Sequence, residues 1–386
     1  MPCFCLTGAA RNDVGEMKAR VRVYLLTYRR AELLRRALHS LLIQTATDWV
    51  CELHNDAPGD DLPRKILSEL APGDPRFVYH PHRHNWGAMT TFNHAFAGGP
   101  EPLAAILEDD NWWEPVFLER MLAVMAARPE AEIAWANMRC WQEMPDGGWH
   151  DTGNTIWPVI DCPHLTIAWP QLLQFDGPLH SNGAMLVRSR VGKRLQVPLS
   201  VPLSHMENLR ERAFRSPLVL VPEVLANFSL TLETARPSGR AHWARVQAMM
   251  GAAFLRHIPL SPDEQSRLWE ARRAAHPPAT AGLFFAGLLQ PTPGWWRHAT
   301  PGDWWRFLRG CVRRPLAAFA AVRSRRSNPE LWREIDRATA AACTRPQDAA
   351  DIGRGRIASR SDLTAAAPGG DPGKDRAVPP PPASRC

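Results

Sequence analysis

Residues 21–44 read VRVYLLTYRRAELLRRALHSLLIQ, and the change of hydrophobic spacing within this stretch indicates the fold class. Residues 21–26 form a short apolar run of the kind found in buried strands. From residue 31 onward, apolar side chains return every three or four positions, at Leu33, Leu34, Ala37, Leu38, Leu41 and Leu42. That spacing is typical of an amphipathic helix, so the stretch predicts a strand followed directly by a helix.

The same alternation continues along the chain with short connections. Further strands are expected at residues 49–54, 77–79, 103–107, 133–136, 183–187 and 219–225, and helices at residues 62–70, 86–97 and 115–127. This order predicts an α/β fold, a mostly parallel, Rossmann-like sheet flanked by helices on both faces. Such sheets bind ligands at the carboxyl ends of their strands, so we expect the functional residues just after each strand.

The 386 residues divide into zones of different composition. Hydrophobic residues make up 45% and charged residues 22%, which excludes a collagen-like or wholly disordered chain. The formal net charge is +7, and residues 236–345 hold 18 arginines against 7 acids. We expect an N-terminal tail at residues 1–20, a folded domain at 21–235, a basic helical region at 236–344 and a disordered tail rich in proline and glycine at 345–386.

The cysteine pattern bears on the compartment. The eight cysteines are scattered and form no CxxC pair, so we expect neither a cysteine-bound zinc site nor a disulfide framework. The N-terminus lacks a convincing secretory signal, and no stretch reaches the ~20 apolar residues that span a bilayer. Together these features predict a cytoplasmic protein with reduced thiols.

Three consecutive acids, Glu108, Asp109 and Asp110, follow the apolar run at 103–107. Their mutual repulsion is costly unless a cation or solvent relieves it. Oxygen ligands of this kind suit Mg²⁺ or Mn²⁺, which bind one or two carboxylates together with phosphate oxygens. The triplet therefore indicates a metal site, and the alternative is a solvated acidic turn before the helix that starts near Pro115.

Six segments, in this order, resemble those of family 2 glycosyltransferases, a group with the GT-A fold. The segments are residues 23–45 (from VYLLTYRR to the helix ending in QT), 53–56 (LHND), 85–93 (NWG followed by Asn93), 108–110 (EDD), 181–188 (SNGAMLVR) and 205–208 (HMEN). In the family they correspond to a "PTYNR"-type turn with its helix, a "VDDGS" strand end, an "N-x-G…N" segment, a DxD-type metal site, the strand before the acceptor region and an "ED" pair. The resemblance covers about residues 20–230 and implies an enzyme that moves a sugar from a nucleotide-sugar donor to an acceptor hydroxyl.

The resemblance also implies roles for the residues at the first strand ends. Thr27 and Tyr28 would contact the nucleotide base and ribose, and Asp56 would accept a hydrogen bond from the base. Arg83 would meet phosphate charge, and Asn85 would shape the turn into the next helix. Considered alone, Thr27 and Asp56 fit ordinary turns, and Arg83 fits a solvated loop arginine equally well.

The later motifs supply the expected catalytic groups. Asp110 would be the metal ligand, with Glu108 and Asp109 near the ribose or the metal, and Mn²⁺ or Mg²⁺ would neutralise the leaving diphosphate. An acceptor hydroxyl needs a base, and Glu207 matches that position in an inverting reaction. His180 would flank the acceptor pocket. For Glu207, the alternative is a surface acid paired with Arg210.

Several positions depart from the family pattern. Leu26 replaces the usual proline, Asn55 replaces the first acid of "DDGS", Glu108 replaces the first acid of DxD, and Asn208 replaces the second acid of "ED". These changes leave open an alternative function, a carbohydrate- or nucleotide-binding GT-A protein without turnover.

Tryptophans mark two further regions. Trp112, Trp113, Trp149, Trp157 and Trp169 lie near the expected sugar site, where flat rings pack well on sugars, although core packing is the default role for each. In the basic region, the pairs at 295–296 and 304–305 lie among arginines, a signature of membrane-interface helices. We therefore expect a glycan or lipid-linked acceptor and a place in bacterial polysaccharide biosynthesis. Residues 236–344 are expected to make peripheral membrane contact; the alternative for this region is a helical subdomain packed on the core. No nucleic-acid-binding motif accompanies the charge, so a nucleic-acid partner is not expected.

Overall fold

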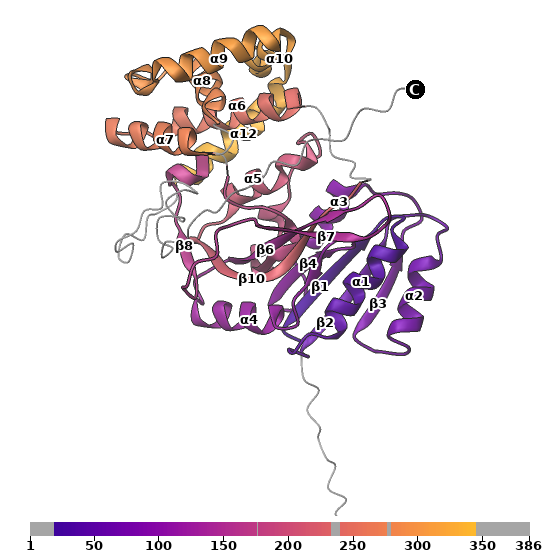
Figure 1. Cartoon of the computed structure of the whole chain (residues 1–386). Helices are drawn as coiled ribbons and strands as arrows, with labels where there is room; N and C mark the ends of the chain where they lie inside the picture. The colour runs from indigo at the N-terminus through magenta and orange to yellow at the C-terminus, as the bar shows by residue number, and fades with distance from the viewer. Residues whose placement is uncertain (1–18, 176, 233–239, 276–278, 345–386) are drawn as a thin grey trace, which may run out of the picture.

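A ten-stranded mixed sheet forms the centre of the N-terminal part of the molecule (Figure 1). The computed structural model describes residues 19–175, 177–232, 240–275 and 279–344. Apart from residues 19 and 20, the expected tails at 1–20 and 345–386 lie outside these ranges. The strands are β1 (Val21–Thr27), β2 (Trp49–Asn55), β3 (Phe77–Pro81), β4 (Leu103–Glu108), β5 (Trp112–Trp113), β6 (Ile133–Glu143), β7 (Trp149–Thr155), β8 (Leu165–Ile167), β9 (Met185–Arg188) and β10 (Leu218–Leu230).

The strand order is β3-β2-β1-β4-β9-β6-β10-β5, with β7 paired to β6 and β8 paired to β10. The β1 strand pairs in parallel with β2 and β4, β2 with β3, and β6 with β10, whereas β9 runs antiparallel between β4 and β6. Leu26 lies opposite both His54 and Glu108, so the carboxyl ends of β1, β2 and β4 meet at one edge. This arrangement confirms the mostly parallel sheet predicted from the sequence.

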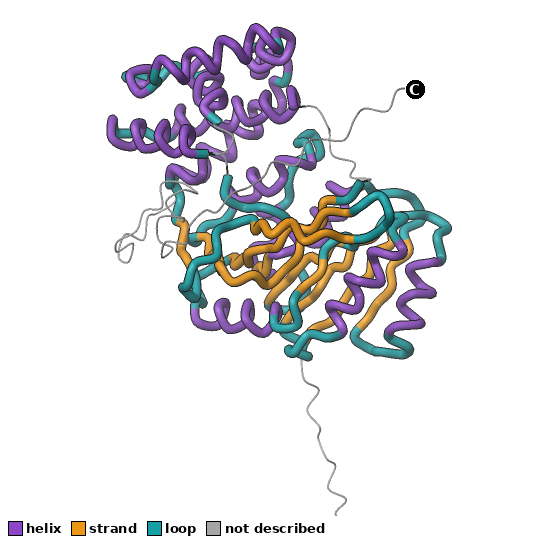
Figure 2. The backbone as a smooth tube through the Cα atoms, in the orientation of Figure 1, coloured by secondary structure: helices purple, strands orange, loops and turns teal. Residues whose placement is uncertain are grey.

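Helices cover both faces because alternate strand residues point to opposite sides. On one face, α1 buries Leu34 and Leu38 against Val23 and Leu25 of β1. On the other face, Tyr24 packs with a core that includes α3 residues. The helices of this part are α1 (Ala31–Leu42), α2 (Leu62–Leu70), α3 (Ala88–Ala95), α4 (Phe117–Ala127) and α5 (Met206–Arg210). Figure 2 shows strands and helices alternating along this part.

The C-terminal part is helical, as expected, and forms its own layer beside the sheet (Figures 1 and 2). Its helices are α6 (Arg240–His257), α7 (Pro262–Ala274), α8 (Thr280–Leu289), α9 (Pro301–Arg313), α10 (Pro315–Val322), α11 (Ser324–Ser327) and α12 (Pro329–Cys343). Met249 of α6 and Ile335 of α12 share one core with Trp135 of β6, which attaches the helical layer to the sheet. Trp269, Phe284 and other residues form a separate core within the layer.

The two tryptophan pairs of this region have different surroundings. Trp295 is fully buried beside Trp269, so its expected place on a membrane-facing surface is wrong. Trp305 is 66% exposed, as a surface role requires. Within the described residues, no helix is both long and apolar enough to cross a bilayer.

Candidate functional site

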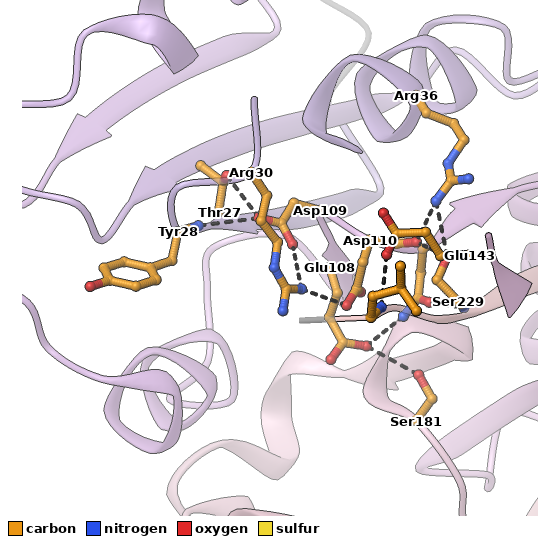
Figure 3. A network of polar contacts seen from close by, with 12 residues as sticks. Thr27, Tyr28, Arg30, Arg36, Glu108, Asp109, Asp110, Glu143, Ser181 and Ser229 are labelled. Atoms are coloured by element: carbon orange, nitrogen blue, oxygen red, sulfur yellow. Dashed lines mark hydrogen bonds and ion pairs between the residues drawn. The ribbon is translucent and has the colours of Figure 1, made fainter. Parts of the chain in front are cut away.

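Hydrogen bonds join the ends of β1, β2 and β4 into one polar edge. The backbone N–H of Asp56 donates to the Thr27 carbonyl at 3.0 Å, and that of Asp109 donates to the Leu26 carbonyl at 3.1 Å. The Thr27 hydroxyl and the Tyr28 N–H both donate to Oδ2 of Asp109, at 2.9 and 3.2 Å (Figure 3). The structure therefore brings together Thr27, Tyr28, Asp56 and the acidic triplet, which are separated by up to 83 positions in the chain.

Arg30 supplies a positive charge to the acidic triplet (Figure 3). Its Nη1 lies 2.6 Å from Oδ2 of Asp110 and 3.5 Å from Oδ1 of Asp109. Arg29, at φ 57°, turns the chain between β1 and α1 just before this residue. The sequence analysis missed Arg30, although an arginine that begins the helix after β1 is placed to reach the edge next to it. The repulsion expected within the triplet is thus partly relieved by the chain itself.

Asp109 is the most perturbed acid of this edge. Burial, followed by the neighbouring charge of Asp110, raises the pKa of Asp109 to about 7, while Arg30 and the hydrogen bond from Thr27 oppose the rise. A carboxyl group that titrates near neutral pH is common in functional sites, where burial and like charges are brought together.

Glu108 points away from the other two acids (Figure 3). Its Oε2 accepts hydrogen bonds from Nδ2 of Asn111 at 2.9 Å and from the Ser181 hydroxyl at 3.1 Å. Ser181 has φ 60°, a conformation that costs a non-glycine residue about 1–3 kcal/mol and that clusters at functional sites. Gly183 lies so close that a Cβ there would be 3.1 Å from both Asn111 Nδ2 and Glu108 Oε2. The segment before β9 is therefore fitted tightly against Glu108.

Glu207 lies next to that segment on α5. Its Oε1 accepts from Nδ2 of Asn182 at 3.1 Å, while the Asn182 Oδ1 accepts from Nη1 of Arg210 at 2.6 Å. Arg210 is 1% exposed, and burial lowers its pKa to about 9. The charge of Glu207 opposes that shift, so the two groups interact, but Arg210 is buried rather than on the surface. Asn182 thus binds the Glu207 carboxylate, and its neighbour in the chain, Ser181, binds Glu108.

Asp56 holds the start of α3. Its carboxylate accepts hydrogen bonds from the N–H groups of Trp86 at 2.6 Å and Gly87 at 2.9 Å, and contacts Nδ1 of His82 at 2.9 Å. A carboxylate has about four lone-pair positions, so Asp56 retains capacity for one more donor. The Asx turn considered for Asp56 is formed instead by Asn55, whose Oδ1 accepts from the Ala57 N–H at 3.0 Å.

The remaining predicted residues lie around this edge. The Tyr28 ring is 43% exposed. Arg83 and Asn85 are exposed on the loop that joins β3 to α3. The His180 ring packs against Phe228 with centroids 4.9 Å apart.

A second arginine that sequence reasoning missed lies behind Asp110. Arg36 of α1 is sandwiched between Trp112 and Trp149, with its guanidinium carbon 3.8 and 4.2 Å from the two ring centroids. It donates to the Asp110 carbonyl at 2.8 Å and to the Ser229 hydroxyl at 2.9 Å (Figure 3). Burial lowers the pKa of Arg36 to about 10. Two of the five tryptophans considered for a sugar site thus pack on Arg36.

The other three tryptophans of that set pack within the protein. Trp113 and Trp157 are 1% and 3% exposed and belong to the sheet cores. Trp169 packs against Phe254 of α6, with ring centroids 5.9 Å apart. Core packing, the default role, describes these three residues.

The donor set at this edge fits a hard divalent cation. Asp109 and Asp110 offer only carboxylate oxygens, and a positive charge already lies between them in the form of Arg30. Mg²⁺ and Mn²⁺ prefer such oxygen ligands and are commonly shared with phosphates. Asp110, at 20% side-chain exposure, is the more accessible of the two acids.

Part of this sequence is similar to known proteins. Residues 23–179 match the model of glycosyl transferase family 2. An uncharacterized glycosyltransferase of Nostoc sp. is 29% identical over 105 residues, which are 27% of this chain and 32% of that protein. The chain thus matches about a third of the length of this relative.

Two solved structures have a similar chain path at low sequence identity. S. aureus TarS 1–349 in complex with UDP-GlcNAc is 11% identical; the match covers 84% of this chain and 90% of that one, with a TM-score of 0.48. The mannosyltransferase PcManGT from Pyrobaculum calidifontis, in complex with GDP-Man and Mn²⁺, is 14% identical over 84% of this chain and 86% of that one, with a TM-score of 0.42. The match to the family model over residues 23–179 confirms the resemblance read from the motifs.

Proposed function

We propose that the protein transfers a sugar from a nucleoside diphosphate sugar to an acceptor hydroxyl. The observation that carries the proposal is the polar edge where Thr27 and the Tyr28 N–H bind Asp109 beside the Arg30–Asp110 pair. An edge with a partly exposed acid, a cation and an exposed aromatic ring suits a nucleotide whose diphosphate needs charge neutralisation. The match of residues 23–179 to the glycosyl transferase family 2 model supports the same reaction class.

In this proposal, each residue of the edge contacts one part of the donor. The exposed Tyr28 ring stacks on the base, and the remaining lone pair of Asp56 accepts a base N–H. Asp110, assisted by Asp109, would hold Mn²⁺ or Mg²⁺, which would supply Lewis-acid neutralisation of the diphosphate. Arg30 then exchanges its carboxylate partner for a phosphate oxygen, a ligand that guanidinium groups bind well.

Glu207 acts as the base. It takes the proton from the acceptor hydroxyl, whose oxygen forms a bond to the sugar C1 as the bond from C1 to the phosphate oxygen breaks. The nucleoside diphosphate leaves on the side opposite to the attacking oxygen, so the configuration at C1 is inverted. The hydrogen bond from Asn182 keeps the Glu207 carboxylate in place for this step.

Release of nucleoside diphosphate from a panel of UDP- and GDP-sugars, with and without Mn²⁺, tests the proposal. We expect metal-stimulated release by the wild type and loss of release in Asp110→Ala. Glu207→Gln should lower kcat by about 10²–10⁴-fold while nucleotide binding is retained, since a general base contributes about that much. Tight donor binding without release by the wild type would instead favour a non-catalytic binding protein, the alternative that the altered motifs leave open.

The outer surface of α9 and α10 suggests where the acceptor is met. Trp305, Val312 and Leu316 are 66%, 81% and 84% exposed. On the inner side of α9, Phe307 stacks on Phe284 with centroids 4.4 Å apart, so the apolar row faces away from the protein. Exposed arginines flank the row at positions 306, 309, 313 and 314.

We infer that this row contacts an anionic membrane surface and that the acceptor is glycan or lipid-linked at a cytoplasmic, peripheral location. Apolar residues that insert between basic ones are the usual composition of interfacial helices. Vesicle co-sedimentation tests this, with binding expected to vesicles containing phosphatidylserine and little to phosphatidylcholine alone. Val312→Ser with Leu316→Ser should weaken binding several-fold. If these substitutions leave vesicle binding intact but disrupt a dimer in sedimentation velocity, the row is a protein contact and the membrane proposal is wrong.

A further inference from the structure

Three histidine rings converge on one oxygen of Glu52, away from the acidic triplet. The Nε2 atoms of His54, His80 and His94 lie 3.0, 3.9 and 4.0 Å from Oε2 of Glu52. The ligand atoms of Glu52, His54 and His80 all lie within 4.8 Å of one another. A carboxylate with three imidazole nitrogens around it is a donor set that transition metals favour.

The sheet builds this cluster. Glu52 and His54 are two positions apart on β2, so they share a face, and His80 lies directly beside His54 on parallel β3. The rings of His54 and His80 stack with centroids 4.8 Å apart. His94 comes from α3, and its ring meets that of His54 edge to face at 5.1 Å. Two strands and one helix therefore hold the donors in place.

The other contacts of these side chains leave the inner atoms facing one another. Arg22 pairs with Oε1 of Glu52, which directs Oε2 toward the histidines. His80 Nε2 is shielded from solvent and has no hydrogen-bond partner among the described residues. The His80 and His94 side chains are 41% and 43% exposed, so the cluster lies near the protein surface.

The spacing agrees with a tetrahedral ion. Bonds of 2.0–2.1 Å to nitrogen and oxygen place tetrahedral ligand atoms about 3.3 Å apart. The three separations from Glu52 Oε2, at 3.0 to 4.0 Å, bracket that value. His94 lies outside the set of ligand atoms that are within 4.8 Å of one another, so its ring must move closer to the others for a four-ligand site to close.

We infer that Glu52, His54, His80 and His94 bind one transition-metal ion of the zinc class. The nitrogen-rich donor set distinguishes this site from the all-oxygen edge at Asp109 and Asp110, which suits Mg²⁺ or Mn²⁺. The binding step itself does not depend on the proposed transferase activity.

The site is connected to the start of α3. His54 Nδ1 lies 3.1 Å from His82 Nε2, and His82 Nδ1 lies 2.9 Å from the Asp56 carboxylate that holds Trp86 and Gly87. A metal at His54 Nε2 leaves Nδ1–H as the donor to His82, whose own Nδ1–H then donates to Asp56. Ligand histidines are commonly fixed by such outer hydrogen bonds. Metal binding therefore stiffens the turn beside the donor edge.

The experiment is a titration of the full, untagged chain with Co²⁺ and then Zn²⁺, after chelator treatment and without nucleotide. We expect one Co²⁺ per chain, with visible d–d absorption of a tetrahedral ion, displaced by Zn²⁺. His80→Asn and His94→Asn, each at an exposed position, should weaken binding by at least about 10-fold. His84→Asn, an exposed histidine of the same loop, and Asp110→Asn should leave the affinity unchanged.

Each other outcome overturns the inference. Absence of visible absorption or of Zn²⁺ binding by the wild type excludes the site. Unchanged affinity in both His80→Asn and His94→Asn places the ion elsewhere, and loss of binding in Asp110→Asn places it at the acidic edge. Circular dichroism of each variant establishes that the fold is retained.

Discussion

Replacement of Arg30 by glutamine tests the electrostatics of the acidic edge most directly. The change removes the cation that lies 2.6 Å from Asp110 and 3.5 Å from Asp109 and keeps a polar side chain at the start of α1. Two neighbouring carboxylates then face each other without a positive partner. We expect a loss of stability, together with a gain in affinity for a divalent cation.

The burial of the three side chains sets the magnitude. Removal of one partner of a buried ion pair costs about 3–5 kcal/mol, whereas exposed pairs contribute about 0.2–1 kcal/mol. Side-chain exposures are 25% for Arg30, 7% for Asp109 and 20% for Asp110, so the edge lies between these limits. Proton uptake by Asp109, whose pKa is already raised to about 7, limits the cost. We therefore expect a loss of about 2 kcal/mol at pH 7.

Urea unfolding in the presence of a chelator measures this loss. Arg35→Gln is the matched control, because its pair with Glu69, at 2.7 Å, is between side chains 37% and 58% exposed and should contribute little to stability. In the double variant Arg30→Gln with Asp110→Asn, most of the stability should return. Added Mn²⁺ should raise the Tm of Arg30→Gln more than that of the wild type, since the competing guanidinium is gone.

Two results would refute this reasoning. Equal losses in Arg30→Gln and Arg35→Gln would mean that the edge is effectively solvated. A Tm increase with Mn²⁺ that is no larger in Arg30→Gln than in the wild type would mean that the ion does not share its position with the guanidinium.

Three further predictions follow from the same contacts. The pKa of Asp109 is raised in the folded state, so its contribution to stability is full below pH 4 and is lost as pH rises toward about 7. Asp109→Asn should therefore flatten the dependence of the unfolding free energy on pH, measured by urea titrations at pH 4.5–7.5. Arg36→Leu should cost about 1–3 kcal/mol, through two lost cation–π contacts and the lost hydrogen bonds to the Asp110 carbonyl and the Ser229 hydroxyl, and should shift tryptophan fluorescence. Gly183→Ala should weaken nucleotide binding, measured by calorimetry, because the added Cβ lies 3.1 Å from Glu108 Oε2. In the control Gly282→Ala, in α8, the added Cβ has no atom within 4 Å, and this change should stabilise the protein by up to ~1 kcal/mol.

The pattern of apolar residues determined the fold class and the edge that carries the site. Strand and helix periods are local properties, so residues 21–44 alone predict a strand and a helix, and the structure has β1 and α1 there. Parallel pairing then brings Thr27, Asp56 and the acidic triplet to one edge, because each follows the carboxyl end of its own strand. The family match, over residues 23–179, spans these same segments.

Only the tertiary structure decided the partner of each polar group. Arg30 neutralises Asp109 and Asp110 across about 80 positions, and Asp56 reaches across 30 positions to the Trp86 N–H. Likewise, the sequence pattern did not distinguish Trp295, which is buried, from Trp305, which is exposed. Side-chain pairing depends on which elements pack together and on which face each residue lies, and these are set by the whole core rather than by any local stretch of sequence.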